Sequence, residues 1–299
     1  MTALTAVLRK SAPCAARRLS ERHLSAFIRF HLLEALEKSG SQENNVERKT
    51  ITQVREQYQA AAIAMLPAFI QEYESDTRAG VRRLVQQAEK KLLELEKEKE
   101  RIYRMGEYER QYENLAYVCG IDEAGRGPLA GPVAAAAVVL PKDCGILYIN
   151  DSKQLSATKR EELYGVIQEQ ALAWGIGMAS PQRIDEINIL HATYEAMREA
   201  INNLGIIPDI LLNDAVTIPD ISVRQVPIIK GDAKSISIAA ASILAKAARD
   251  RLMLEYDKAY PGYGFAVHKG YGTKAHIEAL RRLGPCEIHR KTFLRSFCG

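Results

Sequence analysis

The sequence predicts an α/β fold, a sheet covered by helices, for residues 115–299. Two features lead to this prediction: short apolar segments of strand length alternate with longer amphipathic segments, and several apolar segments end on an acidic residue. Hydrophobic residues make up 47% of the 299 residues and charged residues 26%, values typical of a globular protein with a sizeable core. The net charge of +4 is too small to indicate a nucleic-acid partner by itself.

The apolar segments predict strands at residues 116–121, 133–140, 145–150, 174–179, 210–213 and 222–229. Ser156 is placed to cap a helix whose apolar positions include Leu163, Val166 and Ile167. Further helices are expected at 184–203, as one or two segments, at 235–256 and at 273–283. The order of the strands does not follow from these patterns.

Residues 1–49 have the composition of a disordered tail or linker. The first 22 residues are basic and poor in acids, which suits an organelle transit peptide, a disordered tail or an over-extended gene start. The polar stretch 39–49 is typical of a linker. We expect no ordered structure in this region.

Residues 50–114 predict a helical N-terminal extension. Ile51, Val54 and Tyr58 recur at three- and four-residue steps, and residues 85–112 are dense in Glu, Lys and Arg. Two interpretations stay open: an arm that touches the substrate or a partner, and a solvated helical extension of the main domain. We favour the second, because charge runs are usually solvated faces.

The cysteines and the hydropathy bear on the compartment. The five cysteines form no C-x-x-C pair and no zinc spacing, which indicates reduced thiols in the cytoplasm. No apolar run approaches the ~20 residues that span a bilayer. We expect a cytoplasmic monomer without membrane association.

Acidic residues follow the apolar segments at the points where strands should end. They are Asp122, Glu123, Asp214 and Asp232. Open α/β sheets place their sites at the carboxyl ends of strands. Taken singly, Asp214 and Asp232 could be ordinary turn residues, whereas the adjacent pair Asp122-Glu123 forms no common turn signature.

Four carboxylates brought together would repel one another and raise one another's pKa, and divalent cations are the usual remedy. Oxygen ligands suit Mg²⁺ or Mn²⁺ better than zinc. Two such ions roughly 4 Å apart form the clamp used for phosphodiester displacement. The acids therefore predict a site for two metal ions.

The tripeptide Gly125-Arg126-Gly127 follows the acidic pair directly. Glycine lets the backbone approach a ligand closely, and an arginine between glycines can meet a phosphate. A flexible turn with an exposed arginine is the simpler interpretation of this tripeptide alone.

The motifs together resemble those of bacterial ribonuclease HII. Residues 120–138 carry the signature GIDEAGRGPLAGPVAAAAV, and further matches follow in order, among them Asp151-Ser152-Lys153, IIKGDAKSISIAAASILAK, YPGYGF and HKGYGT. The resemblance covers roughly residues 115–298. Some bacterial members also carry an N-terminal helical extension similar to residues 50–114.

The resemblance implies a ribonuclease H-like fold, with a central mixed β-sheet flanked by helices, and a C-terminal helical part within a catalytic domain at 115–299. It implies an endonuclease that hydrolyses the RNA strand of RNA–DNA hybrids. It also implies incision 5′ to single ribonucleotides in duplex DNA, leaving 3′-hydroxyl and 5′-phosphate ends, and hence a role in removing ribonucleotides from DNA. The cofactor would be Mn²⁺ or Mg²⁺, two ions in the active complex.

Residue roles carry over by position. The resemblance implies that Asp122, Glu123, Asp214 and Asp232 are catalytic metal ligands. Gly125, Arg126 and Gly127 would read the 2′-hydroxyl, the group that distinguishes RNA from DNA. Tyr271 would stack on the sugar after the ribonucleotide.

Several lysines near these motifs could contact phosphates, and Lys230, beside Asp232, is the best candidate; simple surface exposure is the alternative. The basic stretch from His268 to Gly299 should support binding of the duplex backbone. The three histidines in that stretch lack a compact metal spacing, so we do not assign them as ligands.

The chain departs from the family's commoner pattern at Ala215, where many members have glycine. Two rival functions remain at this point. Ribonuclease HIII has similar acids, but it usually has lysine where Arg126 stands. A catalytically silent nucleic-acid-binding protein is disfavoured by the presence of all the acids.

Overall fold

The computed structural model describes residues 48–295, so most of the expected tail at 1–49 lies outside the described residues. The chain divides into two compact units, one ending at Val85 and the other beginning at Gln86. Within residues 48–295, no helix is both long and apolar enough to cross a membrane.

The first unit is helical, as residues 50–114 predicted. It contains α3 (Ile51–Ala60), a 3-10 turn η2 (Ile63–Met65), α4 (Leu66–Tyr73) and the start of α5 (Ala79–Met105). Thr50 and Gln53 form a reciprocal capping box at the start of α3. A small aromatic core holds the unit together, with the Tyr58 and Phe69 ring centroids 5.6 Å apart and those of Phe69 and Tyr73 4.9 Å apart.

The end of α5 and the short α6 (Glu107–Gln111) belong to the second unit and pack into it. Ile102 and Met105 are buried in the same core as α7 and α9. Arg101 donates to the carbonyl of Ile149 over 2.6 Å, and Glu109 accepts from the amide of Ser237 over 3.0 Å. This part of the extension is therefore a piece of the main core, not a solvated helix.

The second unit is built on a mixed five-stranded sheet in the order β3-β2-β1-β4-β5. The strands are β1 (Val118–Ala124), β2 (Val133–Val139), β3 (Ala173–Ala179), β4 (Ile210–Asp214) and β5 (Arg224–Ile228). β2 pairs antiparallel with β1 and β3, whereas β4 pairs parallel with β1 and β5. The predicted mixed sheet flanked by helices is confirmed.

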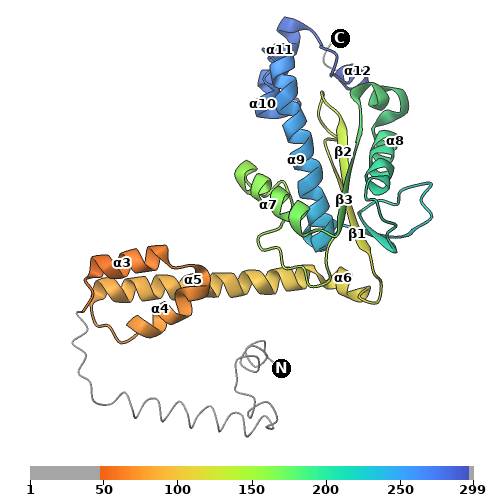
Figure 1. Ribbon diagram of the computed structural model, residues 1–299. Helices are drawn as coiled ribbons and strands as arrows, with labels where there is room; N and C mark the ends of the chain where they lie inside the picture. Colours follow the sequence, from red (N-terminus) through yellow and green to blue (C-terminus); the bar gives the residue numbers. More distant parts are fainter. Residues whose placement is uncertain (1–47, 296–299) are drawn as a thin grey trace. The chain divides into compact units, whose positions relative to one another are not determined.

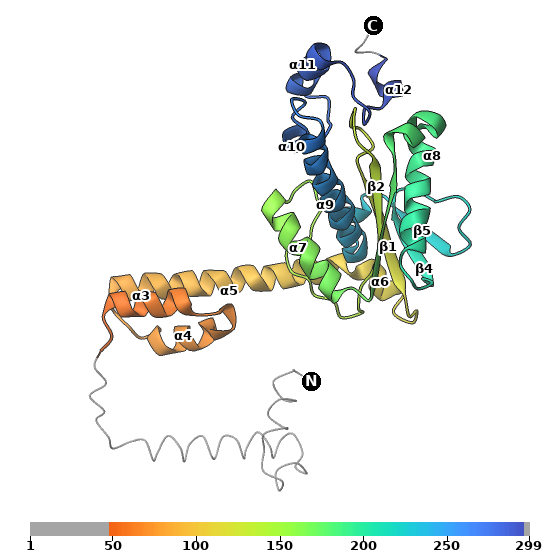
Figure 2. The same cartoon turned by 45° about the horizontal axis from the view of Figure 1, so that its top comes forward.

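Helices cover both faces of this sheet (Figures 1 and 2). One face carries α8 (Pro181–Asn202), which packs on β2 and β3. The other carries α9 (Ile236–Ala259), with α7 (Ala157–Gln170) packed against it. Asn188 breaks α8 with a φ of 68°, so the expected one or two helices are two segments joined at a kink.

Small residues let the layers approach closely. A Cβ added to Gly177 of β3 would lie 2.1 Å from the carbonyl oxygen of Ala196 in α8, and one added to Gly175 would lie 2.2 Å from that of Ala200. The alanines of β2, residues 134–137, are fully buried between the two helical layers. Because the side chains of this alanine-rich strand are small, the helical layers lie close to the sheet and the centre of the unit is tightly packed.

The predicted strand at 145–150 is wrong, because this segment is an irregular loop. Ile146 and Ile149 are buried, as an apolar strand would require, but Tyr148 between them has a φ of 66°. That left-handed conformation is incompatible with a strand. Instead of pairing with a neighbouring strand, the amide of Tyr148 donates to Glu98 of α5 over 2.6 Å.

The C-terminal helical part contains α10 (Phe265–His268), α11 (Lys274–Leu283) and α12 (Lys291–Leu294). Its core includes three buried histidines. The rings of His268 and His276 stack with centroids 4.3 Å apart, and Nε2 of His276 lies 3.0 Å from Nε2 of His289. Nδ1 of His276 faces the carbonyl of Tyr271 at 2.9 Å, so the histidine cluster supports the loop that carries this tyrosine.

Candidate active site

Strand β1 brings Asp122 to the site. Side chains alternate between the faces of a strand, so Gly120 and Asp122 share the face that packs on α9. A Cβ on Gly120 would lie 2.1 Å from the carbonyl carbon of Ser237, which shows how closely α9 approaches β1. Asp122 is only 4% exposed as a result.

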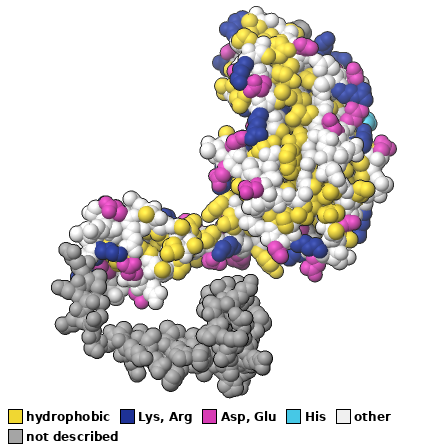
Figure 3. Space-filling view, viewed as in Figure 1, with side chains coloured by type: hydrophobic (Ala, Val, Ile, Leu, Met, Phe, Trp, Pro, Cys, Tyr) yellow, Lys and Arg dark blue, Asp and Glu magenta, His cyan; other side chains and the backbone are white. Residues whose placement is uncertain are grey.

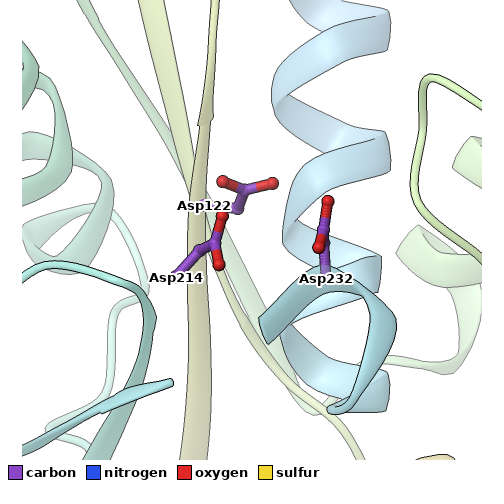
Figure 4. Close-up of side chains that lie close together, drawn as sticks. All are labelled: Asp122, Asp214 and Asp232. Carbon is purple, nitrogen blue, oxygen red and sulfur yellow. The ribbon is translucent and has the colours of Figure 1, made fainter. Parts of the chain in front are cut away.

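The other two aspartates come from the end of β4 and from the turn after β5. Asp214 ends β4, which pairs with β1, and Asp232 lies in the 3-10 turn η3 (Gly231–Ala233) that follows β5. One oxygen from each of Asp122, Asp214 and Asp232 lies within 4.8 Å of the other two (Figure 4). The carboxyl-end rule thus correctly predicted that these three acids would meet.

Glu123 lies outside this set of three oxygens. It follows Asp122 within β1, so its side chain starts from the opposite face of the strand. Its Oε1 is 3.4 Å from Nη1 of Arg126. The structure therefore brings three of the four predicted acids together. It links the fourth to the loop Gly125-Arg126-Gly127, called the GRG loop below.

The cluster is electrostatically strained. Burial raises the pKa of Asp122 well above its ordinary value, and Glu123 and Asp214 raise it further, while a hydrogen bond from Ser242 acts in the opposite direction. Burial also raises the pKa of Glu123 and of Asp232. Carboxyls that resist ionisation in this way are the groups that a bound cation stabilises.

The donor set fits a divalent metal. Three carboxylates supply oxygen ligands alone, which suits a hard cation such as Mg²⁺ or Mn²⁺, and no thiol or imidazole belongs to the set. The acidic triad could therefore hold a divalent ion.

Sequence reasoning did not assign a role to two serines and an aspartate beside the cluster. The hydroxyls of Ser152 and Ser242 lie 2.9 Å apart, and Ser242 hydrogen-bonds Asp122. The negative charge of Asp151 raises the pKa of Asp232 further, after burial. A signal was available, because Ser242 is a polar residue in the alanine-rich stretch of α9.

Lysines surround the cluster unequally. Burial acts to lower the pKa of Lys153, but Asp151 and then Asp122, Asp232 and Asp214 raise it overall, so this ammonium faces the acids. Lys230 is exposed and has a φ of 57° at the start of η3. Of the two, Lys153 has the stronger electrostatic link to the site.

The GRG loop follows β1 and adjoins Tyr271. Gly125 has a φ of 92°, a conformation that favours glycine. A Cβ on Gly127 would lie 4.0 Å from Cε1 of Tyr271, whose side chain is half-exposed. Nζ of Lys246 lies 6.0 Å from the centre of the same ring. The residues predicted to contact the substrate sugar are thus close together.

Basic side chains occur near the C-terminal helices. In Figure 3 they are visible at the top of the molecule, where Figure 1 labels α10, α11 and α12.

A cavity of about 940 Å³ lies elsewhere in the second unit, lined by residues of α5, α6 and the start of α9, including Tyr103, Glu109 and Ser237. It contains none of the predicted site residues.

The geometry agrees with comparisons to known proteins. The family model described as Ribonuclease HII matches residues 119–297, and that of the Ribonuclease HII N-terminal domain matches residues 50–113. A ribonuclease HII from Lachnoclostridium phytofermentans is 62% identical over 224 residues, which cover 75% of this chain and 88% of that protein. The chain belongs to the ribonuclease HII family.

Further relatives support the same assignment. A ribonuclease HII from Clostridioides difficile is 50% identical over 253 residues, covering 84% of this chain and 99% of that protein. The crystal structure of ribonuclease H2 from Pyrococcus horikoshii matches with a TM-score of 0.52 and 28% identity, over 61% of this chain and 97% of that one. Ribonuclease HII enzymes hydrolyse the RNA strand of RNA–DNA hybrids, and membership excludes the silent binding protein considered above.

Proposed function

We propose that this ribonuclease HII incises duplex DNA 5′ to single embedded ribonucleotides, as well as cutting RNA–DNA hybrids, and leaves 3′-hydroxyl and 5′-phosphate ends. Its biological role would be the removal of ribonucleotides from DNA. The observation that supports this most is the proximity of Gly127 to Tyr271, beside the acids of β1. A 2′-hydroxyl and the next sugar could be read there together, next to the cutting site.

In this proposal Asp122, Glu123, Asp214 and Asp232 hold two divalent ions, Mg²⁺ or Mn²⁺. When bound, these ions would activate the attacking water and stabilise the leaving oxygen. Asp122 is central because it is buried beside Asp214 and adjoins Glu123 in the chain. The ions would also offset the repulsion that raises the pKa of Asp122.

The chain's own residues would orient the substrate. Gly125, Arg126 and Gly127 would contact the ribonucleotide, and the ring of Tyr271 would pack on the deoxyribose that follows. An aromatic ring against that sugar disfavours an additional hydroxyl. Lys230 would approach a phosphate from the exposed side of η3, and Lys153 is a second candidate for that contact.

The test compares incision of duplexes that contain one ribonucleotide, an all-RNA strand, or DNA alone. We expect cutting 5′ to the single ribonucleotide and none of plain DNA; absence of the first product would refute the proposal. Tyr271→Ala should weaken incision of the single-ribonucleotide duplex more than it weakens cutting of the all-RNA strand. Tyr148→Ala is a matched control, because the two side chains are 43% and 44% exposed.

We also propose a cytoplasmic monomer without membrane association, in which residues 115–299 form the catalytic domain and 50–114 an extension. The family models divide the chain in nearly the same place. Ile102, Met105 and Glu109 pack into the second unit, so a deletion should leave them in place. The contribution of the extension to incision is therefore best tested by deleting residues 1–85. Light scattering of the full chain tests the monomer; a dimer mass would contradict it.

A further inference from the structure

Two arginines are buried beneath the GRG loop. Arg249 of α9 and Arg290 at the start of α12 are both 0% exposed. Within residues 48–295 neither forms an ion pair, and their hydrogen bonds all go to backbone carbonyls. Burying an unpaired charge is costly, so such a pair calls for an explanation.

Arg290 binds the GRG loop itself. Its Nη2 donates to the carbonyl of Gly125 over 2.6 Å and its Nη1 to that of Arg126 over 2.8 Å. Its Nε donates to the carbonyl of Gly131 over 2.9 Å. One rigid guanidinium thus fixes three carbonyls on the two sides of the loop.

Arg249 joins the loop to the segment that carries Tyr271. It donates to the carbonyls of Pro132 and Ala130 over 2.8 and 2.9 Å, and to that of Lys269 over 2.9 Å. Its contact with the loop is close as well, because a Cβ on Gly125 would lie 2.1 Å from its Nε.

Backbone hydrogen bonds complete the same connection. The amide of Leu129 donates to Gly270 over 2.8 Å, and that of Gly131 donates to Ile288 over 2.9 Å. The amide of Arg290 donates back to Leu129 over 2.9 Å. The segment 129–131 is therefore held between the tyrosine loop and the arginine that binds Gly125 and Arg126.

We infer that Arg290 and Arg249 are positioning residues that set the distance between the GRG loop and Tyr271, and through it the preference for single ribonucleotides. This inference rests on the function proposed above. A single ribonucleotide offers one phosphodiester at which both contacts can be made. A hybrid offers a 2′-hydroxyl at every position, so a displaced loop can still find a productive register.

The test uses the full chain with Arg290→Lys, Arg290→Met and Arg249→Lys. Lysine keeps the charge but cannot reproduce the planar fork that binds three carbonyls. Leu294→Ala is the matched control, because Leu294 is 4% exposed in the same C-terminal core and donates nothing to the loop. Each protein is assayed well below its own melting temperature.

The main readout is kcat/KM on the single-ribonucleotide duplex divided by kcat/KM on the hybrid. We expect this ratio to fall roughly tenfold or more in the arginine variants, since a 1 Å misplacement can cost about 100-fold. Leu294→Ala should lower the melting temperature while leaving the ratio unchanged. An unchanged ratio in folded Arg290→Lys and Arg249→Lys, or an equal fall in Leu294→Ala, would overturn the inference.

Amide hydrogen exchange of residues 119–131 provides a second readout that does not depend on the substrate. Exchange there should accelerate in the arginine variants more than in Leu294→Ala; equal protection would also overturn the inference. If the wild-type enzyme fails to cut the single-ribonucleotide duplex, the proposed function fails. The exchange data then still decide whether the arginines position the loop.

Discussion

The amide of Gly231 donates a 2.7 Å hydrogen bond to Oδ1 of Asp214. This bond ties the turn that carries Asp232 to the carboxylate that ends the neighbouring strand, so two of the three clustered acids are held by one contact. A Cβ on Gly231 would lie 2.6 Å from Cδ1 of Ile238 and 3.4 Å from Asp214 Oδ1. The spacing of the acids thus depends on a residue without a side chain.

Gly231→Ala should therefore weaken both stability and activity. Overpacking against Ile238 should cost about 1–3 kcal/mol in the free energy of unfolding, measured by urea titration. Displacement of Asp214 and Asp232 should lower kcat/KM on a hybrid by roughly 10- to 100-fold. Gly165→Ala is the control, because a Cβ there meets nothing and the helix α7 should gain stability. Wild-type activity in Gly231→Ala would show that this spacing is not critical.

Asp122→Asn should abolish most activity and yet stabilise the metal-free protein. The raised pKa of buried Asp122 means that ionisation disfavours the folded state as pH rises from the ordinary carboxyl range through the raised value. In chelator at neutral pH, the variant should therefore melt at a higher temperature than the wild type. Its kcat/KM should fall by roughly 100- to 1,000-fold or more.

Metal titration separates this explanation from a general effect of charge. Mg²⁺ or Mn²⁺ should raise the melting temperature of the wild type and of Glu169→Gln, which changes an exposed acid of α7 that does not belong to the cluster. The rise should be much smaller in Asp122→Asn. An equal rise in all three proteins would place the metal elsewhere.

The sequence was sufficient to predict the sheet and the meeting of the three aspartates. Strand-length apolar segments ending on acids carry enough information, because parallel neighbours such as β1 and β4 present their ends at the same edge. The position of Glu123 was harder to predict from the sequence. Its strand was expected to end at Ile121, but β1 continues to Ala124, and only a strand through 123 sends adjacent acids to opposite faces.

Tertiary contacts explain what the sequence could not predict. The segment 145–150 is apolar enough for a strand, but the contact of Tyr148 with Glu98 fixes it as a loop. Glu109 lies in a charged stretch that resembles a solvated face, yet it caps α9 through Ser237. The carbonyl contacts of Arg290 have no sequence signature, since any residue can supply a carbonyl.

Ala215 marks a position where glycine should be more stable. It follows Asp214 and has a φ of 57°, in the left-handed region that glycine adopts without strain, which explains why many members of the family have glycine there. Relief of this conformation is worth roughly 1–2 kcal/mol, and the added freedom of glycine in the unfolded chain costs about 0.5–1 kcal/mol. Ala215→Gly should therefore gain about 0.5–1 kcal/mol in urea unfolding. Ala275→Gly, in the exposed face of α11, should instead lose stability, and the same loss at 215 would contradict the prediction.

The histidine cluster should make the stability of the protein depend on pH below neutrality. Only one proton fits between the facing Nε2 atoms of His276 and His289, which are 3.0 Å apart. Burial, reinforced by the charge of His276, lowers the pKa of His289 to about 4 from an ordinary value of 6.5. Between these two values the unfolded chain binds a proton that the folded chain does not, so the free energy of unfolding falls as the pH falls.

This loss should amount to roughly 2–3 kcal/mol between neutral pH and the lower end of the window. The measurement is urea unfolding at a series of pH values for the wild type and for His289→Gln, whose amide cannot titrate. The variant should be less stable at neutral pH, and its stability should decline less steeply toward acid, because it lacks the imidazole that takes up a proton on unfolding. The carboxyl groups that titrate in the same range are common to both proteins, so they do not contribute to the difference between the two curves. If the two curves ran parallel, His289 would already be protonated in the folded state, and the buried cluster would have to hold a charge that its geometry disfavours.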